Sequence, residues 1–143
     1  MKILVSACLL GENCKYNGGN NFNETIAQLQ EKHEVFPFCP EVEGGLSTPR
    51  IPCEIIKGKV IGKDNMDYTE FFLKGAEKAL EYAKEHDIHI AVLKQRSPSC
   101  GYGEIYDGSF SATVIEGMGK TAELLEKEGI EIFTEKKCGR GER

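Results

Sequence analysis

The feature that most constrains this chain is an apolar segment that runs into a small polar loop containing a cysteine, and it occurs three times. The clearest copy is IHIAVLKQRSPSCG, residues 88–101, in which an apolar run is followed by the loop that carries Cys100. The other copies are Lys2–Leu10, which contains Cys8, and Glu34–Cys39. Because α/β proteins place their chemistry where buried strands end in such loops, we expect the three cysteines to share one site.

Apolar periodicity along the chain predicts strands that alternate with helices. Asn23 and Asp67 are suitable N-terminal caps for two of these helices. The expected strands are Lys2–Leu10, Glu34–Cys39, Ile88–Lys94 and Ile130–Thr134; the expected helices are Glu24–Lys32, Asp67–His86 and Thr121–Lys127; and Glu54–Ile61 is expected to form a small hairpin.

This order predicts an α/β fold in three layers, a mostly parallel, twisted, Rossmann-like sheet with helices on both faces and a small hairpin insertion. Pro37 cannot donate a ladder hydrogen bond, so the second strand should lie at an edge, and right-handed crossovers then give the strand order 2-1-3-4. The glycine-rich segment 101–118 is interpreted as a functional loop or a hairpin. Residues 1–143 are expected to form a single domain, with residues 136–143 as a loose charged tail.

Composition narrows the class of protein. Hydrophobic residues make up 40% of the chain and charged residues 29%, which favours a folded globular protein. The formal net charge of −5 argues against a nucleic-acid polymer as partner, because non-specific binding to nucleic acid needs a basic face. No apolar run approaches the ~20 residues of a membrane span, and the N-terminal apolar segment is too short for a signal peptide. We therefore expect a cytoplasmic protein without membrane contact, and the sequence gives no indication of its oligomeric state.

The six cysteines are the main candidates for chemistry. In a reducing cytoplasm they indicate metal binding, catalysis or simple burial rather than disulfides. An all-thiolate set made of Cys8, Cys39 and Cys100 suits iron–sulfur or zinc chemistry better than it suits hard cations. Three ligands instead of four leave an open coordination position, as in catalytic metal sites. The other cysteines are expected to be small buried hydrophobic residues: Cys14, Cys53 and Cys138.

Polar residues close to these cysteines complete the expected site. Glu41 follows the second of them by two residues in a glycine-rich turn, where it is either a general base for water or a solvated loop acid. Ser97 and Ser99 flank a proline and either cap the turn or hydrogen-bond a substrate. Arg50 and Asp107 are expected to be structural.

Four segments carry a resemblance to a known family. They are VSACLLGENCKYNGG (5–19), FCPEVEGGLSTPR (38–50), LKQRSPSCGYGEIYDGSF (93–110) and GKTAELLEKEGI (119–130). Together they resemble the DUF523 family of small bacterial and archaeal proteins, which includes the thiouracil desulfidases. The most distinctive motifs are C-P-E-x2-G-G-L-x-T-P-R and S-P-S-C-G-x-G-x-I-Y-D-G, and the resemblance covers nearly the whole chain.

The resemblance implies an iron–sulfur enzyme. It assigns a [4Fe–4S] cluster to three cysteines, which fall on Cys8, Cys39 and Cys100, and it leaves the fourth iron open to the sulfur of a small thiolated pyrimidine. The implied activity is non-redox, hydrolytic desulfidation, in which thiouracil becomes uracil and sulfide is released. The implied cofactor is therefore the [4Fe–4S] cluster alone.

The resemblance also implies roles for residues beside the cluster. The proposed acid–base glutamate of the family falls on Glu41, and a supporting catalytic serine falls on Ser97. Ser99 and Gly101 are expected to bind the substrate.

Two other functions remain compatible with the sequence. One is an iron–sulfur or zinc module that senses or stores without turnover, because metal ligation and catalysis would use the same residues. The other is a metal-free thiol enzyme, with Cys8 as nucleophile and Cys14 as resolving thiol. It predicts a colourless protein whose activity is lost on alkylation.

Overall fold

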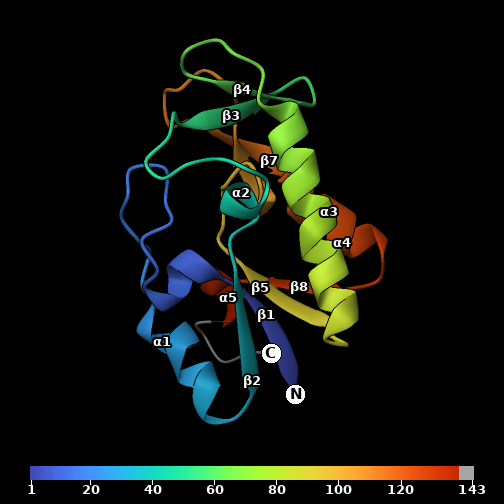
Figure 1. The fold of residues 1–143 in the computed structure, drawn as a ribbon. Coiled ribbons are helices and arrows are strands. Elements are labelled where there is room, and N and C mark those ends of the chain that lie inside the picture. Colours follow the sequence, from blue (N-terminus) through green and yellow to red (C-terminus); the bar gives the residue numbers. More distant parts are fainter. Residues whose placement is uncertain (139–143) are drawn as a thin grey trace.

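The computed structural model describes residues 1–138 and is built around a four-stranded parallel sheet (Figure 1). Val5 of the first strand lies level with Pro37 on one side and with Val92 on the other. The predicted order 2-1-3-4 and the edge position of the proline-containing strand are confirmed. From edge to edge the strands are β2 (Glu34–Phe38), β1 (Lys2–Ser6), β5 (Ile90–Leu93) and β8 (Glu131–Thr134).

Helices cover both faces of this sheet, as parallel strands require. One face packs against α3 (Thr69–Glu85) and α4 (Lys120–Lys127), which also contact each other. The other face is covered by α1, whose predicted cap is present because the Asn23 side chain accepts the Ile26 amide at 3.1 Å. The elements on this second face are α1 (Glu24–Ala27) and the 3-10 segments η1 (Ala7–Leu10) and η2 (Gln28–Glu31).

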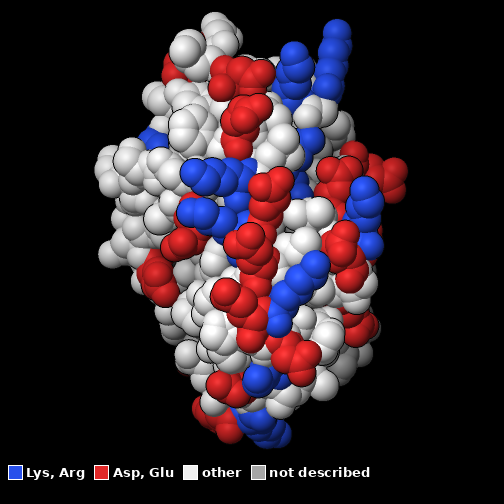
Figure 2. All heavy atoms as spheres, turned by 45° about the vertical axis from the view of Figure 1, so that its right-hand side comes forward, with Lys and Arg blue, Asp and Glu red and all other residues white. Residues whose placement is uncertain are grey.

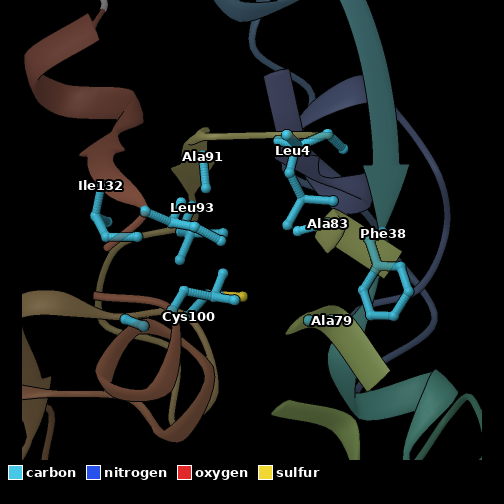
Figure 3. Close-up of a cluster of buried hydrophobic side chains, with 12 residues drawn as sticks. Leu4, Phe38, Ala79, Ala83, Ala91, Leu93, Cys100 and Ile132 are labelled. Atoms are coloured by element: carbon cyan, nitrogen blue, oxygen red, sulfur yellow. The ribbon is translucent and has the colours of Figure 1, made fainter. Parts of the chain in front are cut away.

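Alternate strand residues supply two cores, one on each face of the sheet. The core under α3 and α4 contains Leu4 and Leu93 of the sheet and Leu125 of α4, and each of these is at most 1% exposed. Cys100 belongs to the same core, and Figure 3 shows it beside Leu93. Truncating a fully buried leucine such as Leu125 to alanine would cost about 2–5 kcal/mol of stability. Cys100 is thus a packing residue as well as a candidate for chemistry.

Two antiparallel hairpins lie beyond the carboxyl ends of the parallel strands (Figure 1). The predicted hairpin is present: β3 (Cys53–Ile56) pairs with β4 (Lys59–Gly62), and the turn residues Lys57 and Gly58 have φ of 51° and 81°. The glycine-rich segment 101–118 is a second hairpin, in which β6 (Tyr102–Tyr106) pairs with β7 (Val114–Met118). Of the two interpretations of that segment, the hairpin is therefore confirmed.

Several predicted ends of elements are wrong. The helix expected from Asp67 begins at Thr69, and its N-cap is Tyr68, which makes no side-chain cap hydrogen bond. The helix expected over residues 24–32 changes from α to 3-10 at Gln28. The first strand stops at Ser6 rather than continuing to residue 10, because residues 7–10 turn into η1, which Gly11 closes at φ 96°. The expected loose tail begins instead with α5 (Glu135–Cys138), because the Glu135 carboxylate accepts the Gln95 amide at 2.8 Å and thereby fixes the chain. The remainder of the predicted tail, residues 139–143, lies outside the described residues.

The glycine-rich turn after Cys39 is a short helix, α2 (Pro40–Glu43), which lies against α3 backbone to backbone. A Cβ on Gly75 of α3 would lie 2.0 Å from the Pro40 carbonyl oxygen, and one on Gly44 would lie 2.2 Å from the Phe71 carbonyl oxygen. Glycine in a helix interior costs about 1 kcal/mol relative to alanine. That cost has a structural reason here, since the close approach holds α2 against the longest helix.

None of the helices within residues 1–138 combines the length and the apolar character that a membrane span requires. Figure 2 shows acidic and basic side chains interleaved over the side of the molecule on which α3 and α4 lie. The expectation that no nucleic-acid polymer binds stays a prediction.

Candidate active site

The carboxyl ends of β1, β2 and β5 meet at a cavity of about 520 Å³. Cys8 follows β1 within η1, Cys39 follows β2 directly, and Cys100 lies in the loop after β5. All three thiols line the cavity, and all three are free cysteines. The structure thus brings together the three cysteines that the strand ends singled out, at the edge of the sheet where an open α/β fold places its ligands.

The thiol of Cys100 is enclosed by protein. Burial raises its pKa to about 12, although hydrogen bonds from serine hydroxyls act in the opposite direction. The Ser6 hydroxyl donates to Cys100 Sγ at 3.3 Å, and the Ser99 hydroxyl lies 3.6 Å from the same sulfur. A protein-enclosed sulfur with hydroxyl donors is suited to remain a thiolate once a metal replaces its proton.

The thiols of Cys8 and Cys39 are half-buried and more easily ionised. A hydrogen bond with the Cys14 thiol lowers the pKa of Cys8 to about 7, and the Asn21 amide, whose Nδ2 is 3.4 Å from Cys8 Sγ, acts in the same direction. Hydrogen bonds from the Cys14 thiol and the Val42 backbone amide lower the pKa of Cys39. Both sulfurs are therefore poised as thiolate ligands or nucleophiles.

Cys14 was predicted to be a buried core residue, and that prediction is wrong. It is half-buried, lines the cavity and hydrogen-bonds both Cys8 and Cys39, which raises its own pKa. The only signal in the sequence is its position in the polar loop that follows Cys8. Cys53 was also predicted to be buried, yet it is half-buried and lines the same cavity; it packs partly against the core of the hairpins, where burial raises its pKa to about 12. The side chain of Cys138 lies outside what the structure describes.

Glu41 is held by Arg50, so it is not the solvated loop acid of one interpretation. Arg50 Nε and Nη2 each lie 3.0 Å from Glu41 Oε1, and the two side chains are only 7% (Arg50) and 14% (Glu41) exposed. The guanidinium also donates to the carbonyl oxygens of Cys14 and Ser47 and to the Thr48 hydroxyl, at 2.7, 3.1 and 3.0 Å. Arg50 thus makes hydrogen bonds through Nε, Nη1 and Nη2. A residue that the sequence classed as structural fixes one oxygen of the candidate base.

Two serines meet the other carboxylate oxygen of Glu41. The backbone amides of Ser99 and Cys100 both donate to Ser97 Oγ, at 3.1 and 3.0 Å, so the Ser97 proton is directed outward. Ser97 Oγ lies 2.9 Å from Ser99 Oγ, and Ser99 donates to Glu41 Oε2 at 3.0 Å. Ser97 itself lies 3.4 Å from the same oxygen. The result is a hydroxyl chain that ends on Oε2, next to Cys100.

Gly101 lies behind the site rather than on it. It is absent from the cavity lining, its amide donates to the Ser97 carbonyl oxygen at 2.8 Å, and a Cβ there would lie 2.7 Å from the Glu104 carbonyl oxygen. Its substrate contact stays a prediction without support from this geometry. Asp107 accepts hydrogen bonds from Ser109 in the turn of the β6–β7 hairpin, so the structural role expected for it fits.

The donor set fits an iron–sulfur cluster. Three thiols from separate segments line the cavity, and soft thiolates select iron–sulfur clusters and zinc over hard cations. Among the side chains of residues 1–136, no group of three or more His, Cys, Asp or Glu residues is arranged to hold a single metal ion. The residues of this cavity that would hold a cluster are Cys8, Cys39 and Cys100.

Comparison with known proteins agrees with this geometry. Residues 3–137 match the family described as 2-thiouracil desulfurase. The chain belongs to the 2-thiouracil desulfurase family. It is 43% identical to "Uncharacterized protein YbbK" of Bacillus subtilis (strain 168), with 93% of this chain and 95% of that protein covered. A solved structure described as "[4Fe-4S]-dependent thiouracil desulfidase TudS (DUF523Vcz)" is 42% identical at a TM-score of 0.89, covering 97% of this chain and 93% of that one. The expected family and the α/β architecture are confirmed.

Proposed function

We propose that this member of the 2-thiouracil desulfurase family removes sulfur from a small thiolated pyrimidine such as thiouracil, with a [4Fe–4S] cluster held by Cys8, Cys39 and Cys100 and the fourth iron open to the substrate sulfur. The observation that carries the proposal is one cavity that is lined by these thiols and by a Glu41 carboxylate fixed by Arg50. The family match and the likeness to TudS support the same activity.

The chain's own residues supply the acid–base chemistry. When bound, the cluster supplies a Lewis acid that polarises the thiocarbonyl group. Glu41 Oε2 accepts a proton from water as the water oxygen bonds to the thiocarbonyl carbon; general-base catalysis of this kind contributes roughly 10²–10⁴-fold. Glu41 Oε2 then gives that proton to the sulfur, and the carbon–sulfur bond breaks with its electron pair on sulfur. The added hydroxyl loses its remaining proton to water as the carbonyl forms, and the departing hydrosulfide takes up a proton from water. Uracil and hydrogen sulfide therefore form without net electron transfer, and Glu41 is again a carboxylate. The hydroxyl of Ser99, backed by Ser97, holds Oε2 toward the reacting atoms.

Arg50 has a positioning role in this proposal. Its two contacts with Oε1 leave Oε2 as the only carboxylate oxygen that faces the serines, so the direction of proton transfer is fixed. Its contact with the Cys14 carbonyl oxygen also ties the loop after Cys8 to α2. The loop that follows Cys8 and the helix that carries Glu41 are thereby held at one separation, which is the condition for a water and a substrate to meet in a reactive geometry.

The test is anaerobic purification followed by measurement of iron, acid-labile sulfide and turnover of 2-thiouracil to uracil and hydrogen sulfide. We expect about four irons per chain in the wild type, as a [4Fe–4S] cluster requires. The Cys39→Ala protein should lose iron and turnover, whereas the matched Cys53→Ala control should keep its iron. A Cys39→Ala protein with a full cluster would overturn the ligand assignment.

The same measurements separate the other candidate functions. The lowered pKa of Cys8 and its contact with Cys14 favour a metal-free thiol enzyme over a binding or sensing module. The thiol enzyme gains support if iron-free protein turns over 2-thiouracil and iodoacetamide abolishes the activity. Bound iron without any release of sulfide would instead indicate a binding or sensing module.

A further inference from the structure

Ser6, at the end of β1, donates a hydrogen bond to the sulfur of Cys100. The two atoms are 3.3 Å apart, and Ser6 is 3% exposed. The Ser6 oxygen accepts the backbone amide of Lys94 at 2.9 Å, so its single proton is left for the sulfur. The proton of Ser99, which lies 3.6 Å from the same sulfur, is drawn instead to the Glu41 carboxylate at 3.0 Å. Ser6 is therefore the dedicated donor to Cys100.

Asn21 likewise donates a hydrogen bond to the sulfur of Cys8. Its side-chain Nδ2 lies 3.4 Å from Cys8 Sγ, and its backbone amide donates to the Cys8 carbonyl oxygen at 2.9 Å. The residue is thus attached to Cys8 at two points. The neighbouring Asn20 differs, because its side chain is exposed and donates to Asn13 instead of to a sulfur, at 2.9 Å.

A hydrogen bond to a ligand sulfur lowers the electron density that the sulfur donates to the metal. The donor draws electron density from the thiolate, so less is passed to iron, and the electron-rich reduced state of a cluster is stabilised more than the oxidised state. The same withdrawal makes iron a stronger Lewis acid toward another sulfur. The mechanism above does not use Ser6 or Asn21, although each contacts a proposed ligand.

We propose that Ser6 and Asn21 are positioning residues that donate hydrogen bonds to two cluster ligands and thereby raise the reduction potential of the cluster and its affinity for the substrate sulfur. The inference rests on the proposed function, since it requires the cluster to be bound. It differs from that proposal in its readout, because a reduction potential is measured without any turnover.

The experiment is a dye-mediated redox titration of the anaerobic holoprotein, followed by electron paramagnetic resonance. The Ser6→Ala and Asn21→Ala proteins should each have a midpoint potential more negative than the wild type, and the double variant should be lower than either. The Asn21→Asp protein should be lower than Asn21→Ala, because a carboxylate adds negative charge beside the sulfur. The Kd for 2-thiouracil, read from the change in the cluster spectrum, should rise in the same order.

Matched controls separate this effect from loss of structure. Asn20→Ala alters the same loop without touching a sulfur, and Thr134→Val removes a buried hydroxyl that has no hydrogen-bond partner within residues 1–138. Both should keep the wild-type potential. Ser6→Ala also leaves the Lys94 amide without its acceptor. Ser6→Thr retains the hydroxyl that serves both contacts and should therefore keep the wild-type potential.

The outcomes are distinct. Wild-type potentials in iron-loaded Ser6→Ala and Asn21→Ala proteins would overturn the inference and leave the proposed function intact. An equal shift in the Asn20→Ala control would also overturn it, because the loop as a whole and not the sulfur contact would then be responsible. A wild-type protein that binds no iron would overturn the proposed function itself.

Discussion

The two walls of the cavity hold their cysteines by different means. The sheet-side wall, residues 94–101, carries Cys100, which is 3% exposed and packed into the core under α3 and α4. The loop-side wall, residues 8–21 together with Cys39 and α2, carries three half-buried thiols that hydrogen-bond one another. One wall is positioned by hydrophobic packing and backbone hydrogen bonds, and the other by thiol contacts and a guanidinium clamp. Substituting the cysteine of the first wall should therefore affect stability and chemistry together, whereas substituting a ligand cysteine of the second should affect chemistry alone.

Each wall also carries one arginine–glutamate pair. The Arg50–Glu41 and Arg96–Glu104 pairs have nearly equal separations, 3.0 and 3.1 Å. Their side chains differ in exposure, 7% and 14% for the first pair against 36% and 45% for the second. Losing one partner should therefore have a larger effect in the Arg50–Glu41 pair than in the Arg96–Glu104 pair, because a desolvated side chain cannot replace its lost partner with water.

The largest effect is expected from removing a proposed ligand on each wall. Both Cys100→Ala and Cys39→Ala should abolish iron binding and release of sulfide. In the metal-free proteins, only Cys100→Ala should lower the free energy of unfolding, by about 1 kcal/mol, because it leaves a small cavity in the core. Urea denaturation of both variants measures this difference. Equal stability of the two would contradict the contrast between the walls.

The second-largest effect is expected at Glu41, which lies on α2 and is contacted by Ser97 and Ser99 of the sheet-side wall. In Glu41→Gln the hydrogen-bonding shape survives but no base remains, so kcat for 2-thiouracil should fall roughly 10²–10⁴-fold. Iron content should stay at the wild-type level, since no ligand is touched. Glu43→Gln, an exposed acid on the same short helix, is the matched control and should keep wild-type kcat. A Glu41→Gln protein with wild-type kcat would exclude Glu41 as the base.

Much of the fold was accessible from the sequence because its determinants are local. Apolar runs define the four parallel strands, and the missing N–H of Pro37 defines the edge, so the order 2-1-3-4 follows from general crossover rules. The convergence of Cys8, Cys39 and Cys100 follows from topology alone, since all three come just after parallel strands. What failed were ends of elements: β1 ends at Ser6 because residues 7–10 turn into η1, which Gly11 closes in the left-handed region.

The finer parts of the site depend on contacts between distant residues, which periodicity does not encode. Ser6 and Cys100 are 94 positions apart, and Arg50 reaches the Cys14 carbonyl oxygen across 36 positions. No periodicity marks Ser6 or Arg50 for these contacts, although Arg50 is the last residue of the motif C-P-E-x2-G-G-L-x-T-P-R. Cys14 was misjudged for the same reason, because its partners come from two other segments. A polar residue's role was predictable only where a chain neighbour, such as Cys39 for Glu41, indicated it.

A smaller effect is expected from weakening the buried clamp without removing its charge. Arg50→Lys keeps the cation but loses the planar fork that holds Oε1 at two points. We expect kcat to fall about 10–100-fold with iron retained, as for a displacement of about 1 Å in a catalytic group. Thr48→Val removes only the hydroxyl that accepts from Arg50 Nη1, whereas Glu41 Oε1 is contacted by Nε and Nη2, so kcat should change far less. If Arg50→Lys turned over substrate like the wild type, positioning of Glu41 by Arg50 would be refuted.

The smallest effect is expected at the exposed pair on the sheet-side wall. Glu104→Gln removes the carboxylate that accepts from Arg96 Nε at 3.1 Å, yet both side chains are more than a third exposed and water can take over the hydrogen bond. Urea denaturation should show no change in stability, and release of sulfide should match the wild type. Raising the salt concentration should then leave the wild type and Glu104→Gln indistinguishable, because an exposed pair is screened. A loss of activity in Glu104→Gln would show that the two pairs share one role, and that burial is not what separates the clamp at Glu41 from an ordinary surface contact.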